Sequence, residues 1–358
     1  MAARTVIELD SVRKAYGDGT VAVEELSLAV HEHEVLALVG PSGCGKSTTL
    51  RMVNRLVEPT SGRILLDGED VTTTDPVALR RRIGYVIQNV GLFPHRTVEA
   101  NISTVPALLG WDRKRTRARV GELLDLVGLP AATYAKRYPH ELSGGERQRI
   151  GVARALATDP PVLLMDEPFG AVDPEFRRHL QTEFARIQVE TGTTVILVTH
   201  DIDEAARLGD RIAVLSRGGR LEQVASPIAV LAHPASDRVR DFIGDGSASR
   251  MLALARVQRT DLESADRIVQ PAPAPVRLGA RLTDAFEAVA ALPGAAMGRV
   301  PVVGESGDVI GSLTADGILG ALRRAADAAG ADPGAAGAPG ADAVRDAVED
   351  MPGREPVV

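Results

Sequence analysis

Cysteine and lysine are scarce in this chain, and long apolar runs are absent. Cys44 is the only cysteine, so no disulfide can form within the chain, which fits a reducing compartment. No run of about 18 apolar residues occurs, so we expect no membrane-spanning helix. The first ten residues, MAARTVIELD, lack the apolar segment of a secretion signal, and we expect none.

The net charge is also small over most of the chain. The net charge is −7 over 358 residues, and residues 327–358 hold seven acidic against two basic residues. The rest is nearly neutral, which argues against a dedicated nucleic-acid binder. Residues 327–358 lack the large apolar side chains that offset the entropy of ordering, so we predict a disordered acidic tail.

Strand-like and helix-like segments alternate up to residue 243. Four short runs are apolar throughout: 35–40, 83–88, 161–167 and 194–200. Such runs are typical of parallel strands buried on both faces. Helices are predicted between them, at 46–56 and 143–157. The alternation predicts an α/β fold.

The stretch GPSGCGKST follows the first apolar run and opens a predicted helix. It fits G-x-x-x-x-G-K-[ST], in which backbone N–H groups surround a triphosphate. Lys46 can then reach the β and γ phosphates, and Ser47 can bind Mg²⁺. The alternative is a glycine-rich turn that fits the motif by chance. The motif requires a lysine, and the chain has only four, so such a match is rare. The predicted nucleotide contacts are Gly40, Pro41, Ser42, Gly43, Cys44, Gly45, Lys46, Ser47 and Thr48.

Polar residues end the other three apolar runs. Asp166 and Glu167 follow VLLM, while Gln88 and His200 end the second and fourth runs. The carboxyl ends of parallel strands meet at one edge of a sheet, where open α/β sheets bind ligands. There Asp166 can hold Mg²⁺ and Glu167 can orient or deprotonate the attacking water. A surface acidic pair is the alternative for these two carboxylates.

A second glycine-rich helix start, LSGGERQR, lies almost a hundred residues after the phosphate loop. Ser143 is a natural N-cap, and Gly144 and Gly145 let the backbone approach an anion. A single nucleotide does not need both helix starts. In a two-fold dimer, however, the motif of one subunit could close over ATP held by the other.

Together with GAVD at 170–173, these motifs resemble the nucleotide-binding subunit of ATP-binding cassette (ABC) transporters over residues 5–243. The resemblance implies a P-loop NTPase cassette with a RecA-like core, an antiparallel β subdomain and a helical subdomain. It implies a catalytic set of Glu167, His200, Gln88 and Lys46, and a metal set of Ser47, Gln88 and Asp166. It also implies that Tyr16 stacks on adenine, that His200 holds the γ-phosphate, that Ser143, Gly144 and Gly145 contact that phosphate in trans, and that Asp173 joins the two sites. Many members read SALD where this chain reads GAVD, but the aspartate is kept.

Four longer stretches are similar to importers of glycine betaine, carnitine, choline and related quaternary amines: residues 54–71, 83–102, 166–184 and 237–244. This similarity implies ATP and Mg²⁺ as cofactors and a peripheral place on the cytoplasmic face of the membrane. The implied partners are a second copy of the chain, integral membrane permease subunits and an extracytoplasmic solute-binding protein. Another small solute, such as an amino acid, is an alternative cargo. A soluble non-transport ABC ATPase is a remoter alternative, because the chain has one cassette and no heptad run.

The remaining residues are predicted to form a linker with one short helix at 244–262 and a small compact domain at 263–326. The stretch 298–319 resembles half of a CBS (cystathionine β-synthase-type) domain pair. Only one repeat is present, and Asp316 departs by one position from the pattern Thr-x-x-Asp that would start at Thr314. The domain is interpreted as a dimerisation module or as a sensor of ionic strength or of a nucleotide.

Overall fold

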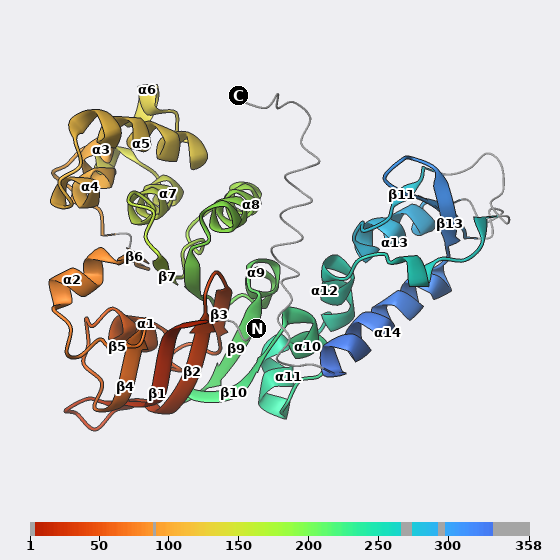
Figure 1. Cartoon of the computed structure of the whole chain (residues 1–358), viewed down its shortest axis with the longest axis horizontal. Coiled ribbons are helices and arrows are strands. Elements are labelled where there is room, and N and C mark those ends of the chain that lie inside the picture. Colours follow the sequence, from red (N-terminus) through yellow and green to blue (C-terminus); the bar gives the residue numbers. More distant parts are fainter. Residues whose placement is uncertain (1–3, 89–90, 266–273, 293–297, 332–358) are drawn as a thin grey trace. The chain divides into compact units, whose positions relative to one another are not determined.

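A computed structural model describes residues 4–88, 91–265, 274–292 and 298–331. The chain divides into two compact units, whose described residues lie within 4–222 and 223–331 (Figure 1). Within these described ranges, no helix is long and apolar enough to cross a membrane.

The first unit is built on a six-stranded sheet in the order β10-β9-β3-β8-β7-β6, with β9, β3, β8, β7 and β6 paired in parallel. The strands are β3 (Val35–Val39), β6 (Ile83–Val86), β7 (Val162–Asp166), β8 (Thr194–Val198), β9 (Arg211–Ser216) and β10 (Arg220–Ala225). Every residue of β3, β7 and β8 is buried. The four predicted apolar strands are therefore confirmed, and so is the α/β class.

A second, antiparallel sheet has the order β2-β1-β4-β5. Its strands are β1 (Thr5–Ala15), β2 (Val21–His31), β4 (Ser61–Leu66) and β5 (Glu69–Asp70). Leu9 of β1 lies between Leu28 of β2 and Ile64 of β4, and all three side chains are buried. This sheet is the antiparallel subdomain that the resemblance implied.

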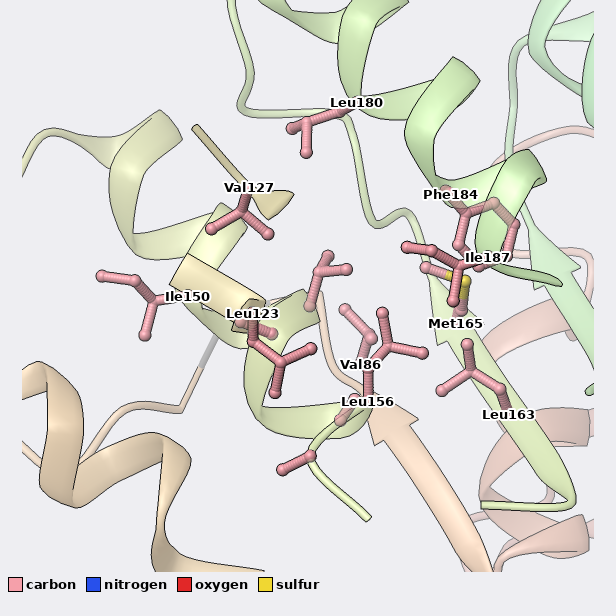
Figure 2. Close-up of a cluster of buried hydrophobic side chains, with 14 of the residues drawn as sticks. Val86, Leu123, Val127, Ile150, Leu156, Leu163, Met165, Leu180, Phe184 and Ile187 are labelled. Carbon is pink, nitrogen blue, oxygen red and sulfur yellow. The ribbon is translucent and has the colours of Figure 1, made fainter. Parts of the chain in front are cut away.

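Helices of the first unit pack beside the parallel sheet or form a separate group next to it (Figure 1). They are α1 (Lys46–Val53), α2 (Pro76–Arg81), α3 (Val98–Ile102), α4 (Thr104–Leu108), α5 (Arg113–Leu126), α6 (Ala131–Tyr134), α7 (Gly144–Ala155), α8 (Pro174–Thr191) and α9 (Ile202–Leu208). Figure 2 shows how one apolar cluster joins the two groups. Leu123 of α5 and Ile150 of α7 belong to the same buried cluster as Val86 of β6, Met165 of β7 and Phe184 of α8. The helical group is therefore anchored to the strands that carry the polar strand ends.

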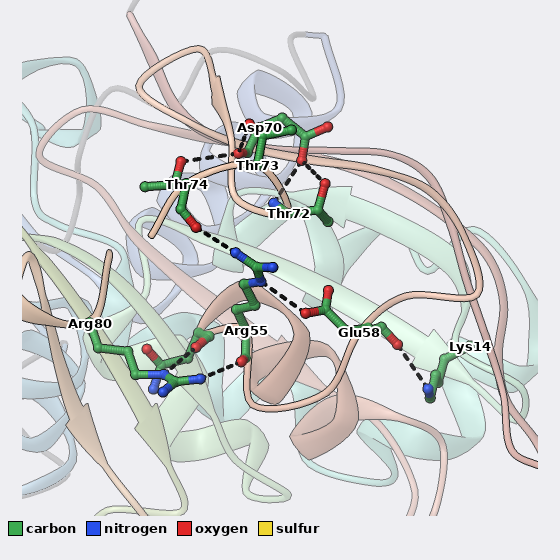
Figure 3. A network of polar contacts seen from close by, with 9 residues as sticks. Lys14, Arg55, Glu58, Asp70, Thr72, Thr73, Thr74 and Arg80 are labelled. Atoms are coloured by element: carbon green, nitrogen blue, oxygen red, sulfur yellow. Dashed lines mark hydrogen bonds and ion pairs between the residues drawn. The ribbon is translucent and has the colours of Figure 1, made fainter. Parts of the chain in front are cut away.

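Polar contacts attach the loop after α1 to the antiparallel sheet (Figure 3). Lys14 Nζ on β1 donates to the carbonyl of Glu58 at 2.8 Å, and Arg55 Nε donates to the Glu58 carboxylate at 2.8 Å. Arg80 of α2 donates to the carbonyl of Arg55 at 2.6 Å. These bonds fix the C-terminal end of the helix that the phosphate loop opens.

The second unit contains a three-stranded sheet, β11-β12-β13, with β11 and β12 parallel and β12 and β13 antiparallel. Its elements are α10 (Pro227–Ala232), α11 (Asp237–Ile243), α12 (Ser247–Leu254), β11 (Val276–Arg277), α13 (Leu282–Ala290), β12 (Val300–Val303), β13 (Val309–Leu313) and α14 (Ala315–Ala331). Val300, Val302 and Leu313 are buried against Leu282 and Ile318. The compact helix and strand pattern predicted for 263–326 is present.

The boundaries differ from those expected from the sequence. We expected the cassette to reach residue 243 and a linker to follow, whereas 223–331 forms one unit. The reason is packing: Ile228 of α10, Leu252 of α12 and the buried Val257 all contact the apolar core of that unit. Helix α14 also extends into the predicted tail as far as Ala331, and residues 332–358 lie outside the described residues.

Candidate active site

The phosphate loop begins where β3 ends, and two of its glycines, Gly40 and Gly45, are required by close backbone approach. Gly40 has φ +149°, and a Cβ there would lie 2.2 Å from the carbonyl oxygen of Leu215. Gly45 has φ +108°, and a Cβ there would lie 2.5 Å from the carbonyl oxygen of Ala22. Side chains at these positions would push the loop away from its neighbours. Helix α1 then starts at Lys46, with its free N–H groups at the loop.

Lys46 lies inside this loop. Its ammonium group donates to the carbonyls of Gly40 at 2.7 Å and Pro41 at 3.0 Å, and lies 3.7 Å from Cys44 Sγ. Cys44 is fully buried, in agreement with its interpretation as a small loop residue. The amino group is therefore held within the loop by these two carbonyls.

A hydroxyl and a carboxylate meet beside the loop. Ser47 Oγ donates to Asp166 Oδ1 at 2.9 Å, which joins the first turn of α1 to the end of β7. Asp166 is buried, and burial raises the pKa of its carboxyl group, although the Ser47 bond opposes this. Oxygen donors of this kind are the ligands that Mg²⁺ prefers, so the pair fits that ion.

Glu167 connects three strand ends. Its carboxylate accepts a hydrogen bond from Gln88 Nε2 at 3.3 Å, and His200 Nδ1 lies 3.3 Å from the other oxygen. The residue has φ +48°, a conformation that is rare for a residue with a side chain and that clusters at functional sites. The structure thus brings together the polar groups that follow β6, β7 and β8, as their positions predicted.

The second glycine-rich helix start has the predicted N-cap. Ser143 Oγ accepts from the N–H of Glu146 at 3.2 Å, and the Glu146 carboxylate accepts from the N–H of Ser143 at 2.7 Å. This capping box fixes the first turn of α7. A Cβ on Gly145 would lie 3.4 Å from the carbonyl oxygen of Ala171, so this turn packs on the GAVD segment. No hydrogen bond joins residues 143–145 to the phosphate loop within the described part of the chain.

Asp173 and Tyr16 lie at the edges of this region. Asp173 Oδ1 caps α8 by accepting from the N–H of Phe176 at 3.0 Å. Tyr16 follows β1; 39% of the residue's surface is exposed, and Lys14 Nζ lies 5.1 Å from its ring centroid.

Two buried residues near the site were not predicted. Gln148 of α7 donates to the carbonyl of Glu167 at 3.5 Å, which links LSGGERQR to the end of β7. Glu204 of α9 is buried near Glu167. Glutamine and glutamate are common on exposed helix faces, so their residue types alone carry no signal of burial. Gln148 lies three, four and seven residues before Gly151, Val152 and Ala155, and this helical spacing would have placed it on their buried face.

Comparison with known proteins extends this geometry. The family model for the ABC transporter matches residues 23–170. The glycine betaine/carnitine/choline transport ATP-binding protein OpuCA of Bacillus subtilis is 47% identical over 282 residues, which cover 79% of this chain and 72% of that protein. This chain belongs to the ABC transporter ATP-binding proteins. It is an ABC-type ATPase, as the resemblance implied.

Other relatives agree with that assignment. The osmoprotectant import ATP-binding protein OsmV of Salmonella typhimurium is 52% identical over 261 residues, which cover 72% of this chain and 68% of that protein. Among solved structures, a dimer of the ATP-binding cassette MJ0796 bound to ADP and Pi has a TM-score of 0.58 at 33% identity. It covers 62% of this chain and 98% of its own. The ABC cassette fold and ATP binding are therefore established for this chain.

Proposed function

We propose that this ABC ATPase energises the import of a quaternary amine osmoprotectant. The observation that carries its catalytic part is the Glu167 carboxylate, held between Gln88 and His200 next to the Ser47–Asp166 pair. The cargo part is supported by the relatives, whose names refer to glycine betaine, carnitine, choline and osmoprotectants.

In the proposed reaction, Glu167 takes a proton from water as the water oxygen bonds to the γ-phosphorus of ATP. The bond from that phosphorus to the β,γ-bridging oxygen breaks, and ADP and phosphate result. Lys46 and the N–H groups of the phosphate loop bind the phosphate chain. His200 holds the γ-phosphate, and Gln88 orients the water.

Mg²⁺ fits the oxygen donors beside the loop. Ser47 and Asp166 would hold it, with Gln88 as a further ligand. When bound, the ion neutralises charge that develops on the phosphate oxygens. The hydroxyl and the carboxylate are already 2.9 Å apart, so no rearrangement of α1 or β7 is needed to present them together.

The proposed active form is a head-to-tail homodimer. Ser143, Gly144 and Gly145 have no hydrogen bond to the phosphate loop of their own chain in the described residues, and Ser143 and Gly144 are exposed. An exposed N-terminus of α7 is free to meet ATP held by a second copy, with Asp173 and Tyr16 lining the same composite site. The solved relative MJ0796 is a dimer, which supports this arrangement.

The proposed assembly includes permease subunits and an extracytoplasmic binding protein, with this chain at the cytoplasmic face of the membrane. The loop after Gln88 would dock on the permease, because Phe93 is 41% exposed while Asn101 holds its backbone by accepting from its N–H and donating to its carbonyl. An apolar side chain on a rigid loop suits a hydrophobic socket.

The second unit is proposed to be a dimerisation or regulatory module of the CBS type. Thr314 Oγ1 accepts from the N–H of Gly317 and donates to Glu263, each at 3.1 Å. The hydroxyl at the first position of the pattern Thr-x-x-Asp is therefore engaged in capping α14. Dimerisation is the reading that this contact favours.

Hydrolysis is tested with the purified full chain and Mg-ATP. Glu167→Gln should lower phosphate release about 10²–10⁴-fold, the usual contribution of a general base. Glu122→Gln is the matched control, because Glu122 is an exposed carboxylate paired with Arg119 on α5. If the wild-type chain releases phosphate and Glu167→Gln releases it equally fast, the assignment of Glu167 as the base is wrong.

Cargo is tested by uptake of labelled glycine betaine in cells at rising osmolarity, with competition by choline and carnitine. We expect salt-stimulated uptake with the wild-type chain and none with Glu167→Gln. ATP hydrolysis without uptake of any quaternary amine would leave the ATPase assignment intact and show that the cargo is another solute, such as an amino acid.

A further inference from the structure

A buried carboxyl group that the proposed reaction does not use lies behind the site. Glu204 is on α9, four residues after His200, and only 6% of its surface is exposed. Its Oε1 atom has no hydrogen-bond partner among the residues that the structure describes. Burying a carboxyl oxygen without a hydrogen-bond partner lowers the stability of the folded chain, so a glutamate at this position needs an explanation other than packing.

On one side, Glu204 contacts the segment that carries His200. The Thr199 side chain hydrogen-bonds to the Glu204 carboxyl group, and the same hydroxyl accepts from the N–H of Asp201 at 3.0 Å. Asp201 Oδ1 in turn accepts from the N–H of Glu204 at 3.2 Å. Thr199 is thus bonded to the carboxyl group of Glu204, and Asp201, on the other side of His200, is bonded to its backbone N–H.

On the other side, the positive charge of Arg177 on α8 acts on the carboxyl group of Glu204. Arg177 Nη2 donates at 2.9 Å to the carbonyl of Val172, the residue before Asp173. The guanidinium group therefore connects Glu204 to the turn that carries Asp173. Glu167 also acts on Glu204 through its negative charge.

We propose that Glu204 is a positioning residue for ATP hydrolysis. Its carboxyl group keeps the segment 199–201, and with it His200, in register with the turn at Val172 and Asp173. This inference rests on the proposed function, because it assumes that His200 and Glu167 act on ATP.

The charge state of Glu204 decides how well it can do this. Burial, aided by the negative charges of Asp201 and Glu167, raises the pKa of its carboxyl group to about 8, although Arg177 and the Thr199 hydrogen bond oppose the rise. At pH 7 the group is mainly neutral. Ionisation adds a third negative charge beside Asp201 and Glu167, which should push the His200 segment away from Glu167.

The test measures ATP hydrolysis by the full chain against ATP concentration between pH 6.5 and 9.5. Glu204→Gln keeps the shape without the charge, and Glu204→Ala removes both. Asp203→Asn is the matched control, because Asp203 is exposed in the same turn of α9. At pH 7 we expect Glu204→Ala to lower kcat at least tenfold with KM for ATP changed less than twofold, and Glu204→Gln to stay within twofold of wild type.

The pH profile separates positioning from mere packing. Between pH 7 and pH 9, wild type and Asp203→Asn should lose about tenfold in kcat, because a group with a pKa of about 8 goes from about 90% to about 10% protonated. Glu204→Gln should not show this loss. If Glu204→Ala does not fold, this comparison alone decides.

The inference would be overturned if kcat fell equally at alkaline pH in wild type and in Glu204→Gln. It would also be overturned if Glu204→Ala had the wild-type kcat. A wild-type chain that hydrolyses no ATP would instead refute the proposed function. If wild type is active and Glu167→Gln inactive while both Glu204 variants match wild type, only the positioning role fails.

Discussion

Asp210 offers the sharpest test of how burial affects the stability of this chain. It precedes β9, is buried, and its Oδ2 accepts from the N–H of Val35 at 2.8 Å. Burial, aided by the negative charge of the nearby Glu34, raises the pKa of its carboxyl group to about 6, although the Val35 bond opposes the rise. Arg211 bonds to Glu34 at 3.2 Å, so Glu34 has a cationic partner, whereas among the described residues the Asp210 carboxylate has only the N–H of Val35.

The sign of the effect follows from linkage. The folded pKa of about 6 lies above the ordinary value of 3.8, so the folded state binds the Asp210 proton more tightly than the unfolded state does. This contribution to stability is full below about pH 4 and is lost as pH rises through 6. A difference of about two pKa units corresponds to about 3 kcal/mol. The change Asp210→Asn keeps an acceptor for Val35 and cannot ionise.

We therefore expect Asp210→Asn to raise the free energy of unfolding by up to about 3 kcal/mol at pH 7.5, and to change it little at pH 4. Urea unfolding followed by the fluorescence of Trp111, the only tryptophan, reports on the first unit. Asp125→Asn is the control, because Asp125 is exposed on α5 and should change stability by less than about 0.5 kcal/mol. A difference between Asp210→Asn and wild type that does not depend on pH, or a loss of stability at pH 7.5, would refute the reasoning.

Three further substitutions test packing and pairing. Gly84→Ala should destabilise the chain by about 1–3 kcal/mol in urea unfolding, because its Cβ would lie 2.6 Å from the carbonyl oxygen of Ala155; an unchanged midpoint would contradict this contact. Phe169→Ala should cost about 3–5 kcal/mol, since the ring is fully buried in the core of the first unit, and a loss below 1 kcal/mol would mean that the core collapses around the gap. Asp261→Asn should lower the thermal midpoint of the second unit and cost about 1.5–3 kcal/mol, because both its oxygens accept from Arg324 at 2.8 Å; calorimetry of the full chain would show whether the second transition moves.

Motifs with strict spacing made much of the site predictable. The phosphate loop needs glycine where the backbone approaches Leu215 and Ala22, and a lysine just after it, so few other sequences fit. The polar ends of apolar strands predicted that Gln88, Glu167 and His200 would meet, because parallel strands end at one edge of a sheet.

The burial of Glu204 could not be predicted in this way. It depends on how α9 packs beside the strands and α8, and those contacts join residues far apart in the chain. The same holds for the unit boundary. Helices α10 and α12 are short, and the packing of Ile228 and Leu252 against the core that includes Val257 assigns them to the second unit.

By itself, the amino-acid sequence determined local features: the positions that need glycine, helix caps such as Ser143, and strands that are apolar on both faces. These depend on backbone conformation and on the order of residues, which the sequence contains directly. Tertiary structure alone decided which carboxyl groups are buried and which carry a partner, as Asp166, Asp210 and Glu204 show. The reason is that the desolvation of a charge is set by every chain segment packed around it, wherever that segment lies in the sequence.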